Sequence, residues 1–347
     1  DYSHIGHARN YVAFDAFAKY LKFSGYKVFY LQNITDIDDK IIARAREKEV
    51  SPKDLALAFE KEYLDNMKAL GVNSVSKYAR ATSHIKEIIS QVQRLQQKGF
   101  AYEIPGDGIY YDISKFKNYG KLSGRTALQA EDAVSRIDYS KDKRNRGDFC
   151  LWKFTQDSSE PSWPALFGPG RPGWHIEDTA ITEKYFGSQY DIHGAARDLI
   201  FPHHEAEIAQ MEALSGKAPM VNYWMHVGFL TVSGQKMSKS LNNFITIRDI
   251  LGRISPQCLR FLILKNLWSS PVDYSDSALM ETKSALEKIE EFLRKIRSTK
   301  SKSQNKLQKS NSKFIEKLKK DFYKELDDDF NTPKAFAVIF DFIKEAN

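Results

Sequence analysis

Apolar residues return at helical spacing near the start of the chain, in a stripe that includes Val12 and Leu21 within residues 8–23. A short apolar run at residues 27–31 then predicts a strand. The polar stretch at residues 33–40 predicts a turn that opens a second helix. This order of strand, loop and helix is typical of a doubly wound α/β fold.

The pattern changes over residues 51–165, which we interpret as an inserted α+β connective region between two halves of a nucleotide-binding fold. It combines helical periodicity, a short β-rich segment and a charged stretch, at residues 55–69, 85–98, 108–112 and 140–146.

The α/β pattern returns after Gly187, and helices dominate from residue 249. Residues 297–313 hold so few apolar side chains that they predict a linker or a solvated helix surface. We predict that the two halves of the nucleotide-binding fold are residues 1–50 and 166–248, with the insertion between them at residues 51–165. A helical region follows at residues 249–296, and a linker with the start of another helical domain at residues 297–347.

Composition indicates a soluble globular protein. Its 347 residues are 42% hydrophobic and 13% aromatic, which is ample for buried cores. We expect no membrane association, because no apolar run spans a bilayer and no leader pattern opens the sequence. We expect Cys150 and Cys258 to be small buried side chains that form no disulfide, in a protein of the reducing cytoplasm. The net charge of +7 favours a polyanionic partner.

Both ends of the sequence lead us to expect a fragment. No strand precedes the first helix to hold its N-terminus, so we expect one before Asp1 in a longer protein. Residues 341–347 stop within an amphipathic helical pattern, without a glycine or proline to end it.

Two histidines and a glycine, in His4-Ile5-Gly6-His7, stand at the predicted N-terminus of the first helix. Backbone N–H groups and the helix dipole favour a phosphate there, and the imidazoles can donate further hydrogen bonds. Gly6 lets a nucleotide approach without a side chain between. The motif suits ATP, although a pair of surface histidines would read the same way.

A second motif, Lys236-Met237-Ser238-Lys239-Ser240, follows a flexible Ser233-Gly234. Lys236 and Lys239 suit a loop that closes on a triphosphate, although a solvated loop is the plain alternative. Together the two motifs resemble the paired nucleotide signatures of the class I aminoacyl-tRNA synthetases. That resemblance implies a Rossmann-like, doubly wound parallel sheet.

Four further strings make the chain similar to the cysteinyl-tRNA synthetase family, at residues 33–40, 173–177, 201–210 and 326–333. The resemblance covers essentially the whole chain. It implies that residues 249–296 contact the tRNA stem and that residues 297–347 begin an anticodon-binding domain. The implied partners are ATP with Mg²⁺, L-cysteine and the tRNA for cysteine, and we expect a monomer.

His203 and Glu207 are four residues apart on a predicted helix, so both can hold one metal ion. The family binds Zn²⁺ through two cysteines, one histidine and one glutamate, and the zinc takes the substrate thiolate. One cysteine position would precede Asp1, and Asp178 stands at the other. Three interpretations stay open: a zinc site with Asp178 as an oxygen ligand, a weaker site without it, or no metal.

The resemblance also implies that Thr35 and Trp174 line the amino-acid pocket. A turn or helix cap for Thr35 and a core position for Trp174 are the structural alternatives. His193 and Gly194 end a strand near the expected base and ribose of ATP, in a glycine run that Ala195 and Ala196 interrupt.

The implied activity is that of a cysteine–tRNA ligase, which forms cysteinyl-adenylate and transfers cysteine to tRNA. His4, His7, Lys236 and Lys239 would stabilise charge on the phosphates. One alternative is a mycothiol-type ligase that joins cysteine to an amino sugar, but such a ligase needs no region like residues 326–333. Another is a non-catalytic tRNA-binding relative, against which the intact nucleotide motifs argue.

Overall fold

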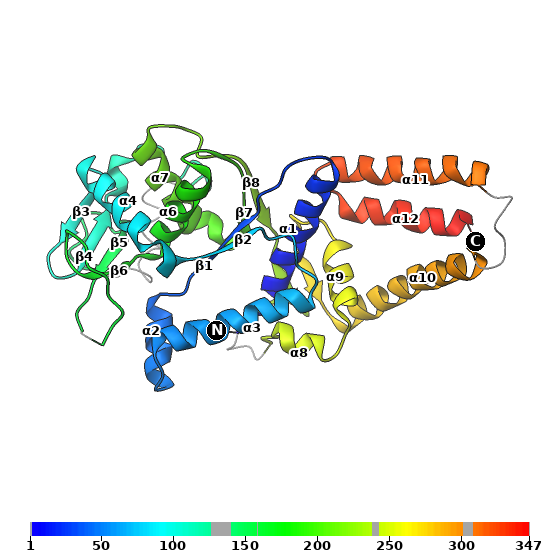
Figure 1. Cartoon of the computed structure of the whole chain (residues 1–347), viewed down its shortest axis with the longest axis horizontal. Coiled ribbons are helices and arrows are strands. Elements are labelled where there is room, and N and C mark those ends of the chain that lie inside the picture. The colour runs from blue at the N-terminus through cyan, green and yellow to red at the C-terminus, as the bar shows by residue number, and fades with distance from the viewer. Residues whose placement is uncertain (1, 126–139, 158, 238–242, 301–307, 347) are drawn as a thin grey trace. The chain divides into compact units, whose positions relative to one another are not determined.

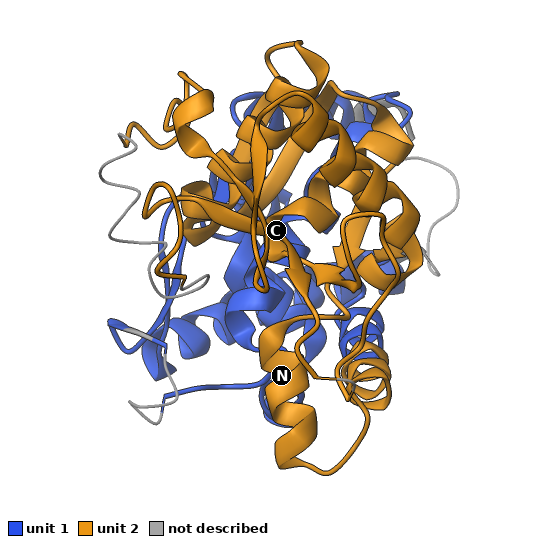
Figure 2. Ribbon diagram, turned by 90° about the vertical axis from the view of Figure 1, so that its left-hand side faces the viewer, with its two compact units in different colours: residues 1–28, 63–74, 226–347 blue, residues 29–62, 75–225 orange. Residues whose placement is uncertain are grey.

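A computed structural model of the chain describes residues 2–125, 140–157, 159–237, 243–300 and 308–346. The chain divides into two compact units (Figure 2). Unit 1 comprises Asp1–Val28, Tyr63–Ser74 and His226–Asn347, and unit 2 comprises Phe29–Glu62 and Val75–Met225. Helix α3 (Pro52–Ala69) is shared between them.

Unit 2 is built around a four-stranded antiparallel sheet in the order β3-β4-β5-β6 (Figure 1). Ala101 pairs with Tyr111 and Trp152 with Pro172, and the register shifts between Ile109 and Tyr110. These strands are β3 (Ala101–Ile104), β4 (Gly108–Tyr111), β5 (Phe149–Phe154) and β6 (Gly170–Pro172).

Three helices pack with this sheet around the main core of unit 2. Helix α4 (Ile85–Gln97) buries Ile85, Ile88, Val92 and Leu95, whose spacing puts them on one face. Helices α6 (Trp174–Phe186) and α7 (Glu205–Ser215) complete the layer. This packing fixes α6 and α7 against each other, and both carry predicted site residues.

The remaining elements of unit 2 include two smaller sheets. Strand β1 (Leu31–Ile34) pairs in parallel with β2 (Lys77–Arg80), and β7 (Tyr190–Ala196) neighbours β8 (Val221–Val227). The others are helix α2 (Asp39–Glu47) and the short turns η1 (Ala81–His84), η2 (Ile113–Lys115), η3 (Arg197–Leu199) and η4 (Ile200–His204).

Unit 1 packs helix α1 (Ile5–Phe23) against α8 (Ile247–Leu251) and α9 (Pro256–Leu264). Thr246 and Ser255 cap the latter two helices with their hydroxyl groups. Strand β9 (Leu230–Val232) pairs antiparallel with β10 (Gln235–Lys236) and parallel with β11 (Val272–Tyr274). The C-terminal helices are α10 (Asp276–Lys300), α11 (Gln308–Asp327) and α12 (Thr332–Ala346).

The strand expected at residues 27–31 is wrong in position, because β1 begins only at Leu31 and runs to Ile34. Its extent follows its partner, since the four residues of β1 face the four residues of β2. The helix predicted to hold His203 and Glu207 is broken near its start, where Phe201 has extended backbone within η4. Among the described residues, no helix is both long and apolar enough to cross a membrane.

Candidate functional site

In unit 1, the first histidine motif forms the N-terminal cap of α1. The Nδ1 atom of His4 accepts hydrogen bonds from the backbone N–H groups of Gly6 and His7, at 3.1 and 3.3 Å. The Nδ1 atom of His7 accepts from the N–H of His4 at 3.2 Å. The two rings stack with centroids 3.7 Å apart. The motif is therefore a capping box made by two imidazoles.

This arrangement determines which ring nitrogen carries the hydrogen. Because both Nδ1 atoms accept, each neutral imidazole of His4 and His7 holds its hydrogen on Nε2. Part of the His7 side chain is exposed to solvent. The protein atoms packed around its ring disfavour the charged form, and together with the adjacent His4 ring they lower the pKa of His7. His7 is thus a neutral hydrogen-bond donor at pH 7.

The remaining predicted residues of the nucleotide motifs are also in unit 1 or outside the described residues. A Cβ atom at Gly6 would lie 2.9 Å from the His4 ring, so glycine also makes room for the cap. Lys236 ends β10. Lys239 lies outside the described residues.

In unit 2, the structure brings Asp178, His203 and Glu207 together in a buried cluster. The Nε2 atom of His203 lies 2.7 Å from Asp178 Oδ2 and 3.1 Å from Glu207 Oε1. One donor atom from each residue lies within 4.8 Å of the others, as holding a single metal ion requires. Asp178 of α6, 25 residues before His203, thus meets His203 of η4 and Glu207 of α7 in one buried polar cluster.

The orientation of His203 is set by a second histidine. The Nδ1 atom of His203 lies 2.7 Å from Nδ1 of the fully buried His175. A hydrogen bond there directs the opposite nitrogen, Nε2, toward the two carboxylates. His175 stays neutral, because burial and the charge of His203 lower its pKa.

The protonation of the cluster follows from burial and charge. Burial alone lowers the pKa of His203, but the hydrogen bonds to Asp178 and Glu207 outweigh it and raise the pKa to about 10. Burial raises the pKa of Asp178, against the opposing effect of His203. The side chains on their own thus hold a proton between the carboxylates, at the place that a divalent cation would take.

Thr35 and Trp174 both lie beside this cluster. The hydroxyl of Thr35 donates to the buried Glu177 carboxylate, which adjoins Asp178 in sequence. The Trp174 ring is half-buried, with its centroid 4.5 Å from that of His203. Neither structural alternative describes these contacts, because Thr35 caps no helix there and Trp174 is incompletely buried.

His193 and Gly194 lie in β7, and Gly194 is exposed. The His193 ring packs against His204 and Trp224, with centroids 4.7 and 4.9 Å away. Its Nδ1 atom lies 2.6 Å from the hydroxyl oxygen of Tyr190 and 3.7 Å from Glu207 Oε2.

Sequence reasoning assigned no role to His175, His204, Tyr190 and Trp224. A signal existed for two of them: His175 lies within a string that was used for the resemblance, and His204 directly follows a predicted ligand. Trp224 had none, because it reaches His193 only through the pairing of β7 with β8. Tyr190 had none either: it lies on β7 three residues before His193, a spacing that puts two side chains on opposite faces of a regular strand.

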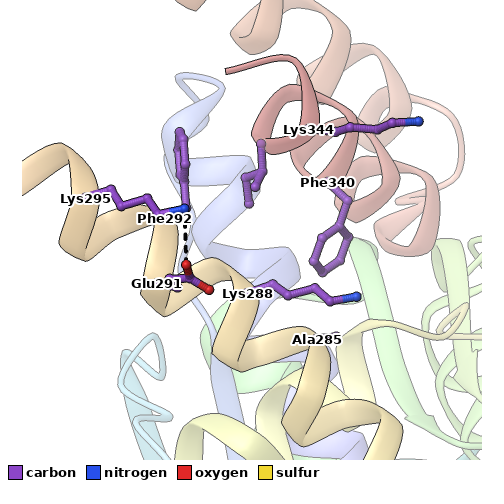
Figure 3. Close-up of a pocket in the computed structure, with 8 residues that line it drawn as sticks. Ala285, Lys288, Glu291, Phe292, Lys295, Phe340 and Lys344 are labelled. Atoms are coloured by element: carbon purple, nitrogen blue, oxygen red, sulfur yellow. Dashed lines mark ion pairs between the residues drawn. The ribbon is translucent and has the colours of Figure 1, made fainter. Parts of the chain in front are cut away.

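A separate pocket lies between α10 and α12 in unit 1 (Figure 3). Its walls combine aromatic and basic side chains, and Lys295 pairs with Glu291 at 3.1 Å. The principal residues are Lys288, Lys295, Lys344, Phe292 and Phe340. It is distinct in sequence from the predicted site residues.

Comparison with known proteins identifies the family and the fold of this chain. Residues 1–284 match the family described as tRNA synthetases class I (C) catalytic domain, and residues 321–347 match the DALR domain. The structure also resembles methionyl-tRNA synthetase from Mycobacterium tuberculosis, with a TM-score of 0.74 at 15% identity. The alignment covers 100% of this chain and 80% of that chain, and it shows the class I fold.

Two curated relatives carry the name cysteine–tRNA ligase. The protein of Thermoplasma volcanium is 53% identical over 85% of this chain and 64% of its own length. The protein of Thermococcus onnurineus is 45% identical over 100% of this chain and 73% of its own length. The chain thus spans about two thirds to three quarters of these relatives. It belongs to the cysteine–tRNA ligase family of class I tRNA synthetases.

Proposed function

We propose that this chain performs the chemistry of a cysteine–tRNA ligase. L-cysteine attacks ATP to form cysteinyl-adenylate with release of pyrophosphate, and a hydroxyl of the 3′-terminal ribose of the tRNA then attacks the cysteinyl carbonyl, so that an ester bond forms and AMP leaves. The observation that carries the proposal is the buried Asp178–His203–Glu207 cluster beside Thr35 and Trp174, in a chain of this family. Buried ionisable side chains with shifted pKa values cluster at functional sites, and this cluster has both properties.

In the first step, the cysteine carboxylate attacks the α-phosphorus of ATP. A bond forms between carboxylate oxygen and phosphorus, the bond to the bridging oxygen breaks, and pyrophosphate leaves with Mg²⁺. His4 and His7 donate from Nε2 to phosphate oxygens, since their Nδ1 atoms accept within the cap. Lys236 and Lys239 add positive charge, which stabilises the departing pyrophosphate.

The three cluster residues fit a divalent cation. An imidazole and two carboxylates, all buried, provide three donors and leave positions for a substrate group. We therefore propose Asp178, His203 and Glu207 as ligands of Zn²⁺, with an oxygen donor at residue 178. The ion supplies a Lewis acid with affinity for thiolate sulfur.

Thr35, whose hydroxyl donates to Glu177, and Trp174 are proposed to line the amino-acid pocket in which cysteine binds. His193 and Gly194 are proposed contacts of the nucleotide. The lysines that line the pocket between α10 and α12 offer cations for tRNA phosphates.

Cysteine-dependent exchange of pyrophosphate into ATP tests this proposal. We expect exchange with cysteine and at least 100-fold less with serine, because a hydroxyl is a poorer ligand than a thiolate. Lys239→Ala should lower the exchange rate far more than it weakens cysteine binding, whereas the exposed Lys217→Ala serves as the control. Equal exchange by Lys239→Ala and Lys217→Ala would refute the role of Lys239, and no exchange by the chain would refute the activity.

A further inference from the structure

Glu207 faces two different groups of donors with its two carboxylate oxygens. Oε1 lies 3.1 Å from His203 Nε2, on the side of Asp178. Oε2 lies 3.7 Å from His193 Nδ1, on the side of His204. Each side completes a set of three donors that lie within 4.8 Å of one another.

We propose that His193, His204 and Glu207 form a second divalent-cation position, with Glu207 bridging it to the position at Asp178 and His203. Two imidazoles and one carboxylate are the donor set of many catalytic zinc and iron sites. The set at Asp178 holds one imidazole and two carboxylates and is the harder of the two. Zinc, cobalt and ferrous ions therefore have a second set suited to them in this chain.

The local geometry supports this position. His204 and Glu207 are almost fully buried, and His193 is half-buried. Trp224 packs against both imidazoles, with centroids 4.9 and 5.0 Å away, and limits how far they can turn. A tetrahedral site needs donors roughly 3.4 Å apart. A shift of about an ångström in the side chains reaches that spacing.

The hydroxyl of Tyr190 competes with the ion for His193. It lies 2.6 Å from Nδ1, the nitrogen that faces Glu207. An ion on Nδ1 must displace this contact, and it leaves the imidazole hydrogen on Nε2, where a nucleotide contact of His193 would be made. Removing the hydroxyl should thus strengthen the second position and leave the first unchanged.

Titration of the metal-stripped chain with Co²⁺ tests the proposal through visible absorbance and the number of ions retained on dialysis. We expect two ions in the wild-type chain, one in His204→Gln and one in Asp178→Asn, with different spectra in the two variants. Glu207→Gln should weaken both positions at least tenfold, and Tyr190→Phe should tighten one of them severalfold. His84→Gln is the matched control, because its ring binds the Arg80 carbonyl outside both sets.

Circular dichroism of each variant establishes that it is folded, and His193→Gln replaces His204→Gln if the latter is not. Loss of all binding in Asp178→Asn would overturn the proposal, as would binding in both the His204 and His193 variants that equals the wild type. Pyrophosphate exchange is measured separately, so a failure of the second position leaves the proposed ligase activity intact, and the converse also holds.

Discussion

Gly173→Ala should disturb the Asp178–His203–Glu207 cluster without changing any of the three residues proposed as metal ligands. Gly173 is the N-cap of α6, the helix that carries Asp178, and its N–H donates to the Leu151 carbonyl at 2.9 Å. A Cβ atom at this position would lie 1.9 Å from the Cys150 carbonyl oxygen, where ordinary contact begins near 3.4 Å. The start of α6 must therefore move about 1.5 Å away from β5.

That displacement has a cost in stability and in binding. Overpacking of this kind costs about 1–3 kcal/mol, and weakening of the hydrogen bond adds about 1 kcal/mol. Asp178 Oδ2, now 2.7 Å from His203 Nε2, moves with the helix. We expect zinc affinity to fall roughly 10- to 100-fold, as it does when the support of a metal ligand is lost.

Urea unfolding and zinc titration against a chromophoric chelator measure the two effects. Gly187→Ala is the control, since Gly187 ends the same helix at φ +79° with no atom near its missing Cβ. It should lose about 1–3 kcal/mol from backbone strain, because φ +79° with ψ −161° is a conformation that essentially only glycine adopts, and it should bind zinc as the wild type does. The reasoning is refuted if Gly173→Ala matches Gly187→Ala in both measurements.

Three further predictions concern contacts elsewhere in the two units. Glu205→Gln should lower the free energy of unfolding in urea by about 2–3 kcal/mol, because the buried carboxylate accepts hydrogen bonds from three backbone N–H groups at 2.6–3.0 Å. Glu183→Gln, at a more exposed carboxylate, should cost less. Arg9→Met should lower the free energy of unfolding by about 2–4 kcal/mol in the same measurement, because the Arg9 guanidinium donates to four backbone carbonyls. A loss no larger than that of the exposed Arg46→Met would contradict this prediction. His7 should stay neutral at pH 6 with its hydrogen on Nε2, and nitrogen chemical shifts of an imidazolium at that pH would disprove the capping argument.

Several features could be predicted because they depend on neighbours in sequence. The stripe of α1 and the apolar face of α4 follow from a period of 3.6 residues. The pairing of His203 with Glu207 follows from their separation by four residues, and it persists although His203 lies in η4 rather than in a regular helix. The two nucleotide motifs and the resemblance to the family could likewise be recognised from the sequence alone.

Other features arise only when distant segments pack together. The limits of β1 depend on β2, more than 40 residues downstream, so no local pattern could place them. The hydrogen bond between His175 and His203 requires α6 and η4 to meet, and the approach of Trp224 to His193 requires β7 and β8 to pair. The sequence by itself thus determined most of the helices, the motifs and the pairing of His203 with Glu207, because backbone periodicity acts over a few residues. Tertiary structure decided the orientation of His203 and the placing of the two Glu207 oxygens toward different histidines, because those depend on side chains that only the packed core brings within hydrogen-bond distance.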